Sequence, residues 1–235
     1  MPTIEVKNLV KNYGSIEAVK DISFNVNEGE IFGLIGPNGA GKTTVLRIIS
    51  TLLTITSGSI SIMNFDVGKK PEEVRKIISY LPEDAGAYKN LSGKAYLEFI
   101  ANFFGSKQDM VQKGVEIADL GGRINDKVDT YSKGMKRRLL VGRALMTNPR
   151  LAILDEPTSG LDVNNAQEVR KIIKNTARQG TTVLLSSHNM LEVEYLCDRI
   201  TLISDGKIVE EGKPKGLMQK HRSLNIEEVF TKVMQ

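Results

Sequence analysis

The stretch that decides the fold is Ile31-Phe32-Gly33-Leu34-Ile35-Gly36-Pro37-Asn38-Gly39-Ala40-Gly41-Lys42-Thr43-Thr44. Its first five residues are almost all apolar, which is typical of a strand buried on both faces of a sheet. A glycine-rich loop follows, and residues 41–51 then continue with helical spacing. The order strand, glycine-rich loop, helix indicates an α/β domain built around this segment.

The loop matches the pattern G-x-x-x-x-G-K-[ST] in the strand-to-helix context that this motif requires. Its glycines allow backbone N–H groups to turn inward around a phosphate, and the positive N-terminus of the following helix faces the same anion. We expect Lys42 to reach the β- and γ-phosphates of a nucleotide and the Thr43 hydroxyl to bind Mg²⁺. The residues predicted to bind the nucleotide here are Gly36, Pro37, Asn38, Gly39, Ala40, Gly41, Lys42, Thr43 and Thr44.

Two more apolar runs, Leu151–Leu154 and Thr182–Leu185, predict further buried strands of a mostly parallel sheet. Ligands of such sheets sit at the carboxyl ends of the strands. We therefore predict that Asp155, after the first run, holds Mg²⁺ through water. Glu156 follows it and is expected to act as the general base on the attacking water. His188, after the second run, is predicted to contact the γ-phosphate or to orient that water.

The N-terminal part of the chain has a different pattern. Thr3–Lys7 and Asp21–Val26 alternate between polar and apolar residues, and Ile60–Met63 is expected to join them in an antiparallel sheet. Near the end, Asp205-Gly206 predicts a hairpin turn between two short strands in 200–209.

Residues from 84 to 146 contain no convincing buried strand, and runs such as Gly93–Phe104 and Gly134–Met146 read as helices. We expect one domain, residues 1–235, of the α/β class, with an inserted helical subdomain and an N-terminal antiparallel β subdomain. Its expected parts are the core at 1–83 and 147–213, the helical insert at 84–146, and a charged helical tail at 214–235.

The composition excludes several classes of protein. The chain has 235 residues with a net charge of +4, which permits an acidic partner but does not argue for nucleic acid. The single cysteine, Cys197, excludes a disulfide scaffold and suits a reducing compartment. No run approaches the roughly 20 apolar residues of a membrane span. Residues 1–11 lack the apolar core of a signal peptide, so we expect a cytoplasmic chain.

The motifs, in this order, resemble the ATP-binding subunit of an ABC transporter, a phosphate-loop (P-loop) NTPase, over nearly the whole chain. Gly36–Thr44 is similar to the Walker A loop, and Leu151–Glu156 is similar to Walker B with its catalytic glutamate. Ser159–Asp162 looks like the D-loop, and His188 looks like the switch histidine. The resemblance implies that Tyr13 stacks on the adenine of ATP, and such stacking is worth about 1–3 kcal/mol for nucleic-acid bases.

The family signature, usually Leu-Ser-Gly-Gly-Gln, has its counterpart in Tyr131-Ser132-Lys133-Gly134-Met135. The resemblance implies that Ser132 and Gly134 contact the ATP of a second ATP-binding subunit, so that ATP draws the two together and hydrolysis removes the bridge. Because this sequence holds one cassette, we expect the second to come from another polypeptide, and we expect a homodimer. We interpret the adjoining run Lys136-Arg137-Arg138 as a solvated helix face or a subunit contact.

Glu83 stands where the family usually has a glutamine that touches Mg²⁺ or water. An ionised glutamate accepts hydrogen bonds but cannot donate them, and we include Glu83 among the predicted Mg²⁺ ligands. These variants, and residues Asn225–Phe230, are similar to the subgroup with separate membrane subunits of the ABC-2 export type. The resemblance implies an ATPase on the cytoplasmic face of the membrane that powers export through a separate permease, which docks between Glu83 and Tyr96.

Other classes of function stay open at this point. One is a soluble ABC-type ATPase that acts on nucleic acid, ribosomes or another non-membrane assembly. Another is a phosphate-loop kinase or GTPase, although the chain lacks the Asn-Lys-x-Asp motif by which GTPases read their base. We interpret Cys197 as a core residue at the end of a helix over 190–197, and His221 as solvated.

Overall fold

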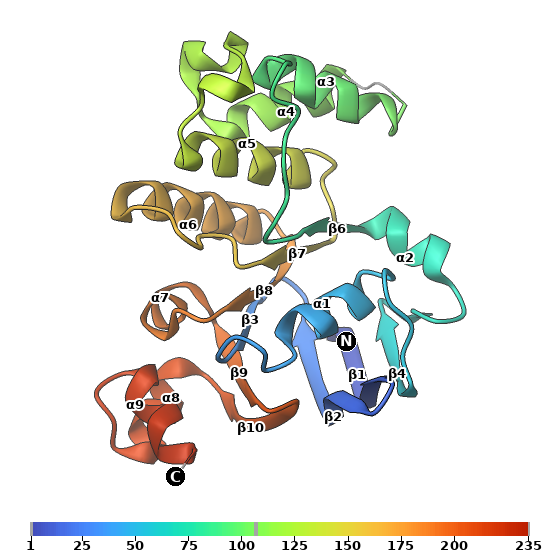
Figure 1. Ribbon diagram of the computed structural model, residues 1–235, viewed down its shortest axis with the longest axis vertical. Coiled ribbons are helices and arrows are strands. Elements are labelled where there is room, and N and C mark those ends of the chain that lie inside the picture. The colour runs from blue at the N-terminus through green and yellow to red at the C-terminus, as the bar shows by residue number, and fades with distance from the viewer. Residues whose placement is uncertain (1, 106–107, 235) are drawn as a thin grey trace.

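The computed structural model describes residues 2–105 and 108–234, except for the side chains of residues 191 and 192. Residues 1, 106, 107 and 235 fall within the expected core, insert and tail but lie outside the described residues. Figure 1 shows the helical insert at one end of the molecule, the sheets in the middle, and the tail at the other end.

A six-stranded sheet forms the centre of the molecule, in the order β10-β9-β3-β8-β7-β6. All its neighbouring pairs are parallel except β10–β9. Every residue of β3, β7 and β8 is buried, as the apolar runs predict. The strands are β3 (Ile31–Ile35), β6 (Ile78–Leu81), β7 (Leu151–Asp155), β8 (Thr182–Ser187), β9 (Arg199–Ser204) and β10 (Lys207–Gly212).

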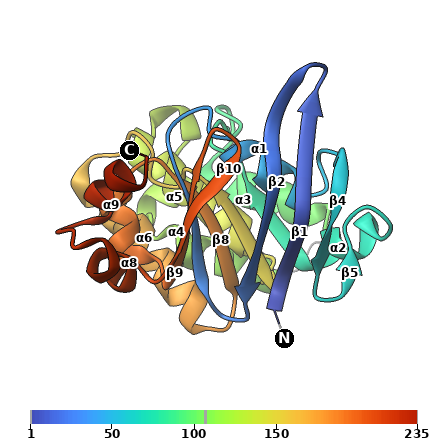
Figure 2. The ribbon, with the colours of Figure 1, turned by 90° about the horizontal axis from the view of Figure 1, so that it is seen from below.

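The N-terminal strands form a separate antiparallel sheet in the order β2-β1-β4-β5, which confirms the expected β subdomain. Phe24 of this sheet stacks on Phe32 of β3, with ring centroids 5.6 Å apart, so the two sheets share one core. Figure 2 shows β1 and β2 standing beside the strands of the larger sheet. The strands are β1 (Pro2–Tyr13), β2 (Ile16–Asn27), β4 (Ser57–Ile62) and β5 (Phe65–Asp66).

Helices surround the sheets and build the insert. In the core they are α1 (Lys42–Ile49), α2 (Pro71–Ile77), α6 (Val163–Arg178) and α7 (Met190–Leu196). The insert consists of α3 (Gly93–Asn102), α4 (Gln108–Ala118), α5 (Lys133–Leu145) and two short 3₁₀ segments, η1 (Gly121–Asn125) and η2 (Val128–Thr130). Among the described residues of 84–146 no named strand occurs, in agreement with the expected helical insert.

The tail forms α8 (Pro214–His221) and α9 (Ile226–Val233), as the sequence predicts. The expectation for His221 is wrong, because its Nε2 lies 2.7 Å from Oε2 of Glu210 on β10 and its side chain is only 20% exposed. Cys197 is buried next to the end of α7, so its assignment to the core is confirmed.

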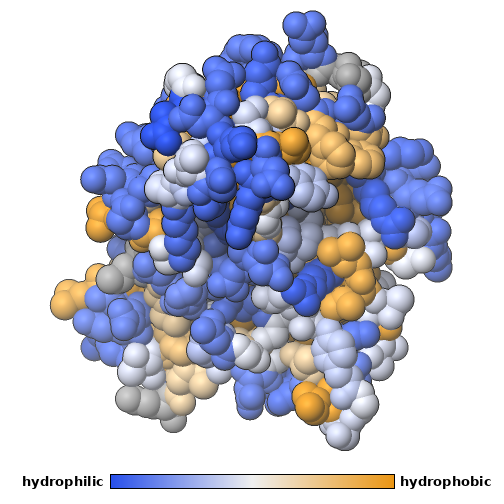
Figure 3. Space-filling view, turned by 45° about the horizontal axis from the view of Figure 1, so that its top comes forward, coloured by the Kyte–Doolittle hydropathy of each residue, from blue (hydrophilic) through white to orange (hydrophobic). Residues whose placement is uncertain are grey.

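Hydrophilic and hydrophobic side chains are unevenly distributed on the surface (Figure 3). The face drawn in Figure 3 is mostly hydrophilic, with small separate hydrophobic patches. In the part of the chain that the structure describes, no helix has the length and apolar character that crossing a membrane requires.

Candidate active site

The phosphate loop joins β3 to α1, and its backbone depends on glycine. Gly39 and Gly41 have φ angles of +83° and +102°, a region that L side chains rarely adopt. A Cβ atom at Gly36 would stand 2.0 Å from the carbonyl oxygen of Ile203 on β9. No side chain caps the first turn of α1, so its N–H groups can serve an anion in the loop.

The ammonium of Lys42 lies inside this loop. Its Nζ donates hydrogen bonds to the carbonyl oxygens of Gly36 at 2.7 Å and Pro37 at 3.1 Å, and it lies 3.6 Å from Oε1 of Glu156. The side chains of Lys42 and Glu156 are each only 6% exposed. A buried cation must have such partners, and they hold the ammonium at the loop rather than in solvent.

Three hydroxyl groups surround the carboxylate of Asp155, at the end of β7. The hydroxyls of Thr43 and Ser186 donate to its Oδ1 at 3.3 and 2.5 Å, and the hydroxyl of Tyr80 donates to its Oδ2 at 3.4 Å. Burial, followed by the negative charge of Asp155, raises the pKa of Tyr80 to about 12, so this hydroxyl stays protonated. The sequence reasoning missed Tyr80 and Ser186 as partners of Asp155, although Ser186 stands two residues before the predicted His188.

The oxygens of Thr43 and Asp155 fit a magnesium ion. Mg²⁺ prefers oxygen ligands and takes only one or two carboxylates, with the phosphates of its nucleotide completing the site. Among the described residues there is no cluster of three or more histidine, cysteine or acidic side chains that could hold a metal by itself.

Glu156 combines burial with an unusual backbone. Its φ of 48° lies in the left-handed region, where a residue with a side chain is uncommon. Its Oε2 lies 2.8 Å from Nδ1 of His188, while its Oε1 is buried and has no hydrogen-bond partner in the described structure. An ionised carboxylate oxygen that has no hydrogen bond can accept one from a water molecule. Lys42 and His188 thus meet on the two oxygens of one carboxylate.

Among the other predicted site residues, Glu83 lines a recess that Glu156 also lines. Tyr13 is 45% exposed at the end of β1. Ser132 caps α5 by accepting a hydrogen bond from the Met135 N–H at 3.2 Å, and no hydrogen bond between described residues joins it to the phosphate loop. The side chain of Asn165 fills the space where a Cβ of Gly134 would stand. The exposed carboxylate of Glu83 accepts a hydrogen bond from the Ser159 hydroxyl at 3.4 Å.

One interpretation from the sequence needs correction. Arg137 does not belong to a solvated helix face, because it is buried and donates hydrogen bonds to backbone carbonyl groups at the end of β7. Its neighbour Arg138 is only partly buried and donates to the carbonyl oxygen of Asp119 at 2.8 Å, within the insert. In the sequence, nothing distinguishes these two adjacent arginines.

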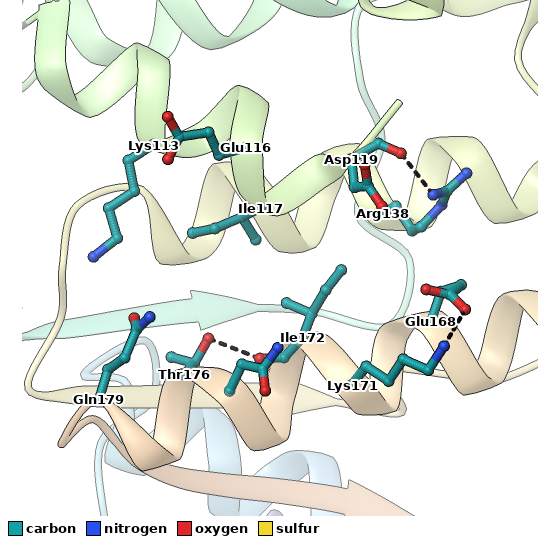
Figure 4. A pocket seen from close by; sticks show the side chains of 11 residues that line it. Lys113, Glu116, Ile117, Asp119, Arg138, Glu168, Lys171, Ile172, Thr176 and Gln179 are labelled. Atoms are coloured by element: carbon teal, nitrogen blue, oxygen red, sulfur yellow. Dashed lines mark hydrogen bonds and ion pairs between the residues drawn. The ribbon is translucent and has the colours of Figure 1, made fainter. Parts of the chain in front are cut away.

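A second recess lies away from these residues. Side chains of α4, α5 and α6 line a cavity of about 350 Å³ between the insert and the core, as Figure 4 shows. Its lining mixes Arg138 and Lys171 with acidic side chains such as Glu168. It contains none of the residues predicted for nucleotide binding or catalysis.

Comparison with known proteins gives a consistent result. Residues 19–159 match the ABC transporter family. The chain is 37% identical to the linearmycin resistance ATP-binding protein LnrL of Bacillus subtilis (strain 168), over 92% of this chain and 71% of that protein. It is also 37% identical to the lantibiotic transport ATP-binding protein SrtF of Streptococcus pyogenes, over 97% and 95% of the two chains.

A solved structure with the same fold is the dimeric post-hydrolysis state of the ATP-binding cassette MJ0796 bound to ADP and Pi. Its TM-score is 0.78 at 26% identity, over 89% of this chain and 98% of that one. The likeness covers most of this chain, so the expected α/β architecture is confirmed as that of an ATP-binding cassette. The chain therefore belongs to the ABC transporter family, as an ATP-binding subunit that couples ATP hydrolysis to transport.

Proposed function

We propose that this chain hydrolyses ATP at the phosphate loop and thereby drives export through a separate membrane subunit. Transport is supported by two relatives, one named for linearmycin resistance and one for lantibiotic transport. Export as the direction rests on the resemblance of Glu83, the signature variant and residues 225–230 to the ABC-2 subgroup. On this proposal the chain is held at the cytoplasmic face of the membrane by its partner.

The observation that carries the catalytic proposal is the meeting of Lys42 and His188 on the Glu156 carboxylate. Glu156 accepts a proton from the attacking water through Oε1, and His188 orients that carboxylate through Oε2. Lys42 leaves the loop carbonyls and Glu156 to contact the β- and γ-phosphates. Catalysis of this kind depends on positioning and charge, with little covalent chemistry for the protein to perform.

The remaining predicted residues bind and orient the nucleotide. Backbone N–H groups of the phosphate loop surround the phosphates, and Tyr13 stacks on adenine. Thr43 and Asp155 would hold Mg²⁺, which neutralises developing charge on the phosphates when it is bound. Glu83 would become a further ligand of Mg²⁺ once its hydrogen bond with the Ser159 hydroxyl is broken.

The substitution Glu156→Gln tests the catalytic role. The amide cannot take a proton from water, so turnover should fall by about 100-fold or more, the usual contribution of a general base. ATP binding, measured with a fluorescent ATP analogue, should persist. The matched control is Glu168→Gln, because Glu168 is paired with Lys171 on α6 and lines the second recess rather than the phosphate loop. Normal ATPase activity of the Glu156 variant would rule Glu156 out as the base.

A row of exposed aromatic rings lies on the insert. Tyr88, Phe99 and Phe103 stack edge to face in a row on the insert, with successive ring centroids 5.3 Å apart. All three are at least 38% exposed, and Phe103 is 74% exposed. This row adjoins the expected docking segment between Glu83 and Tyr96. We propose that it receives an amphipathic helix of the permease, because exposed aromatic rings are frequent anchors at interfaces.

Affinity isolation separates this function from the alternative of a soluble ABC-type ATPase. The tagged chain is extracted in mild detergent, and its partners are identified by mass spectrometry. A stoichiometric partner with several membrane spans supports transport, and Phe103→Ser should weaken its recovery, whereas Leu52→Ser, which alters an exposed leucine near α1, should not. Recovery of soluble proteins or nucleic acid alone would contradict the transport proposal while leaving the ATPase intact.

A further inference from the structure

Arg137 has an unusual set of partners. Although it belongs to α5 of the helical insert, its buried guanidinium donates hydrogen bonds to backbone carbonyl groups of two distant segments of the core. These carbonyl groups are those of Pro82, Glu83, Asp155, Glu156 and Pro157. Arginine alone offers five donors in a rigid plane, so one side chain can bind such a set.

The shortest of these bonds surround Glu156. Nη2 of Arg137 donates to the carbonyl oxygens of Glu156 at 2.7 Å and Asp155 at 2.9 Å, and Nε donates to that of Pro157 at 2.7 Å. On its other side, the N–H of Glu156 donates to the Ser186 hydroxyl at 3.0 Å. The peptide groups on both sides of Glu156 are therefore fixed, which accounts for its left-handed φ of 48°.

The longer bonds reach the segment that follows β6. Nη1 of Arg137 donates to the carbonyl oxygens of Glu83 at 3.2 Å and Pro82 at 3.4 Å. Burial lowers the pKa of the Arg137 guanidinium, while the carboxylates of Glu83, Asp155 and Glu156 act in the opposite direction. The cation thus lies among three carboxylates, but its N–H groups donate hydrogen bonds to backbone carbonyl groups and not to these carboxylates.

We propose that Arg137 is a positioning residue, which fixes the direction of the Glu156 carboxylate and links the orientation of the helical insert to it. The inference rests on the proposed role of Glu156 as general base. Arg137 lies about one helical turn after Ser132 and Gly134, the residues expected to meet the second subunit's ATP. A movement of α5 that accompanies this contact therefore shifts the backbone of the chain's own base.

The test compares Arg137→Lys with Arg138→Lys. Lysine keeps the charge but loses the planar set of donors, so the first change should lower kcat by about 10- to 100-fold, as expected when a catalytic group is misplaced. The dissociation constant for ATP should stay within about twofold, because Arg137 makes no bond to the phosphate loop in the described structure. Arg138→Lys, whose bond stays within the insert, should leave kcat unchanged.

The same change in the Glu156→Gln background distinguishes positioning from a general structural role. If Arg137 acts through Glu156, adding Arg137→Lys to Glu156→Gln should lower the residual rate no further. Wild-type kcat in Arg137→Lys, or an equal loss in both backgrounds, would overturn the inference. Wild-type turnover of Glu156→Gln alone would instead refute the proposed base. Should Arg137→Lys fail to fold, as judged by ATP binding, Arg137→Gln takes its place, with the same outcomes.

Discussion

At the scale of single residues, Glu210 shows how one carboxylate ties the tail to the central sheet. Its Oε2 lies 2.8 Å from Nζ of Lys220 and 2.7 Å from Nε2 of His221, both in α8. Burial alone would raise the pKa of Glu210, but these hydrogen bonds outweigh burial and hold its pKa below the ordinary value of 4.5. The unfolded chain therefore binds this proton more tightly than the folded chain.

The sign of the pH dependence follows directly. The stabilisation by ionised Glu210 is fully present above its ordinary pKa and is lost as pH falls through the lower pKa of the folded state. Glu210→Gln should lower the free energy of unfolding by about 1 kcal/mol at pH 7, and the difference should shrink below pH 4.5. Urea unfolding at pH 7 and below pH 4.5 measures this difference in the free energy of unfolding. Glu17→Gln, which changes an exposed residue of β2, is the control. A difference that does not change with pH would contradict this account.

At the scale of helices and strands, the insert depends on a close approach between α4 and α5. A Cβ atom at Gly142 of α5 would stand 2.7 Å from the carbonyl oxygen of Gly114 on α4 and 3.2 Å from the Cβ of Ala118. Gly142→Ala should therefore push the helices apart and destabilise the protein by about 1–3 kcal/mol, the usual cost of overpacking.

The matched control for this contact is Gly216→Ala in α8, where an added Cβ would meet nothing within 4 Å. Alanine is the better helix former by up to about 1 kcal/mol, so this variant should be as stable as the wild type or more so. Urea unfolding of both variants measures the contrast. A Gly142 variant as stable as the Gly216 variant would show that the two helices separate without cost.

The strands and the site differ in how far the sequence predicts them. β3, β7 and β8 are predictable because both faces are buried and the residues are almost all apolar. β6 is not, because its four residues Ile-Ser-Tyr-Leu are largely half-buried and become a strand by pairing with β7. The phosphate loop and Asp155 are predictable because each belongs to a recognisable sequence motif. The proposed role of Arg137 depends on its hydrogen bonds to carbonyl groups far away in the sequence. The charged run Lys136-Arg137-Arg138 does not indicate these bonds.

At the scale of the whole molecule, the proposed dimer should form when ATP is bound and not hydrolysed. The Glu156→Gln variant should change from monomer to dimer on addition of ATP and Mg²⁺, as measured by light scattering after size exclusion. Adding Ser132→Ala should abolish the dimer. Ser92→Ala is the matched control, since Ser92 caps α3 of the same insert as Ser132 caps α5. A variant that stays monomeric at saturating ATP, or equal losses from both serines, would contradict the proposed contact.

The position of β3 in the sheet also has a consequence for the making of the protein. Its two neighbours, β8 and β9, follow it by more than a hundred residues along the chain, whereas β1, β2, β4 and β5 all lie within residues 2–66. During synthesis the N-terminal sheet can therefore form early. β3 can pair only after β8 and β9 have been synthesised. The phosphate loop gains its flanking strands only when residue 204 has emerged. A nascent chain that is still shorter than this lacks part of the sheet that holds the nucleotide site in place.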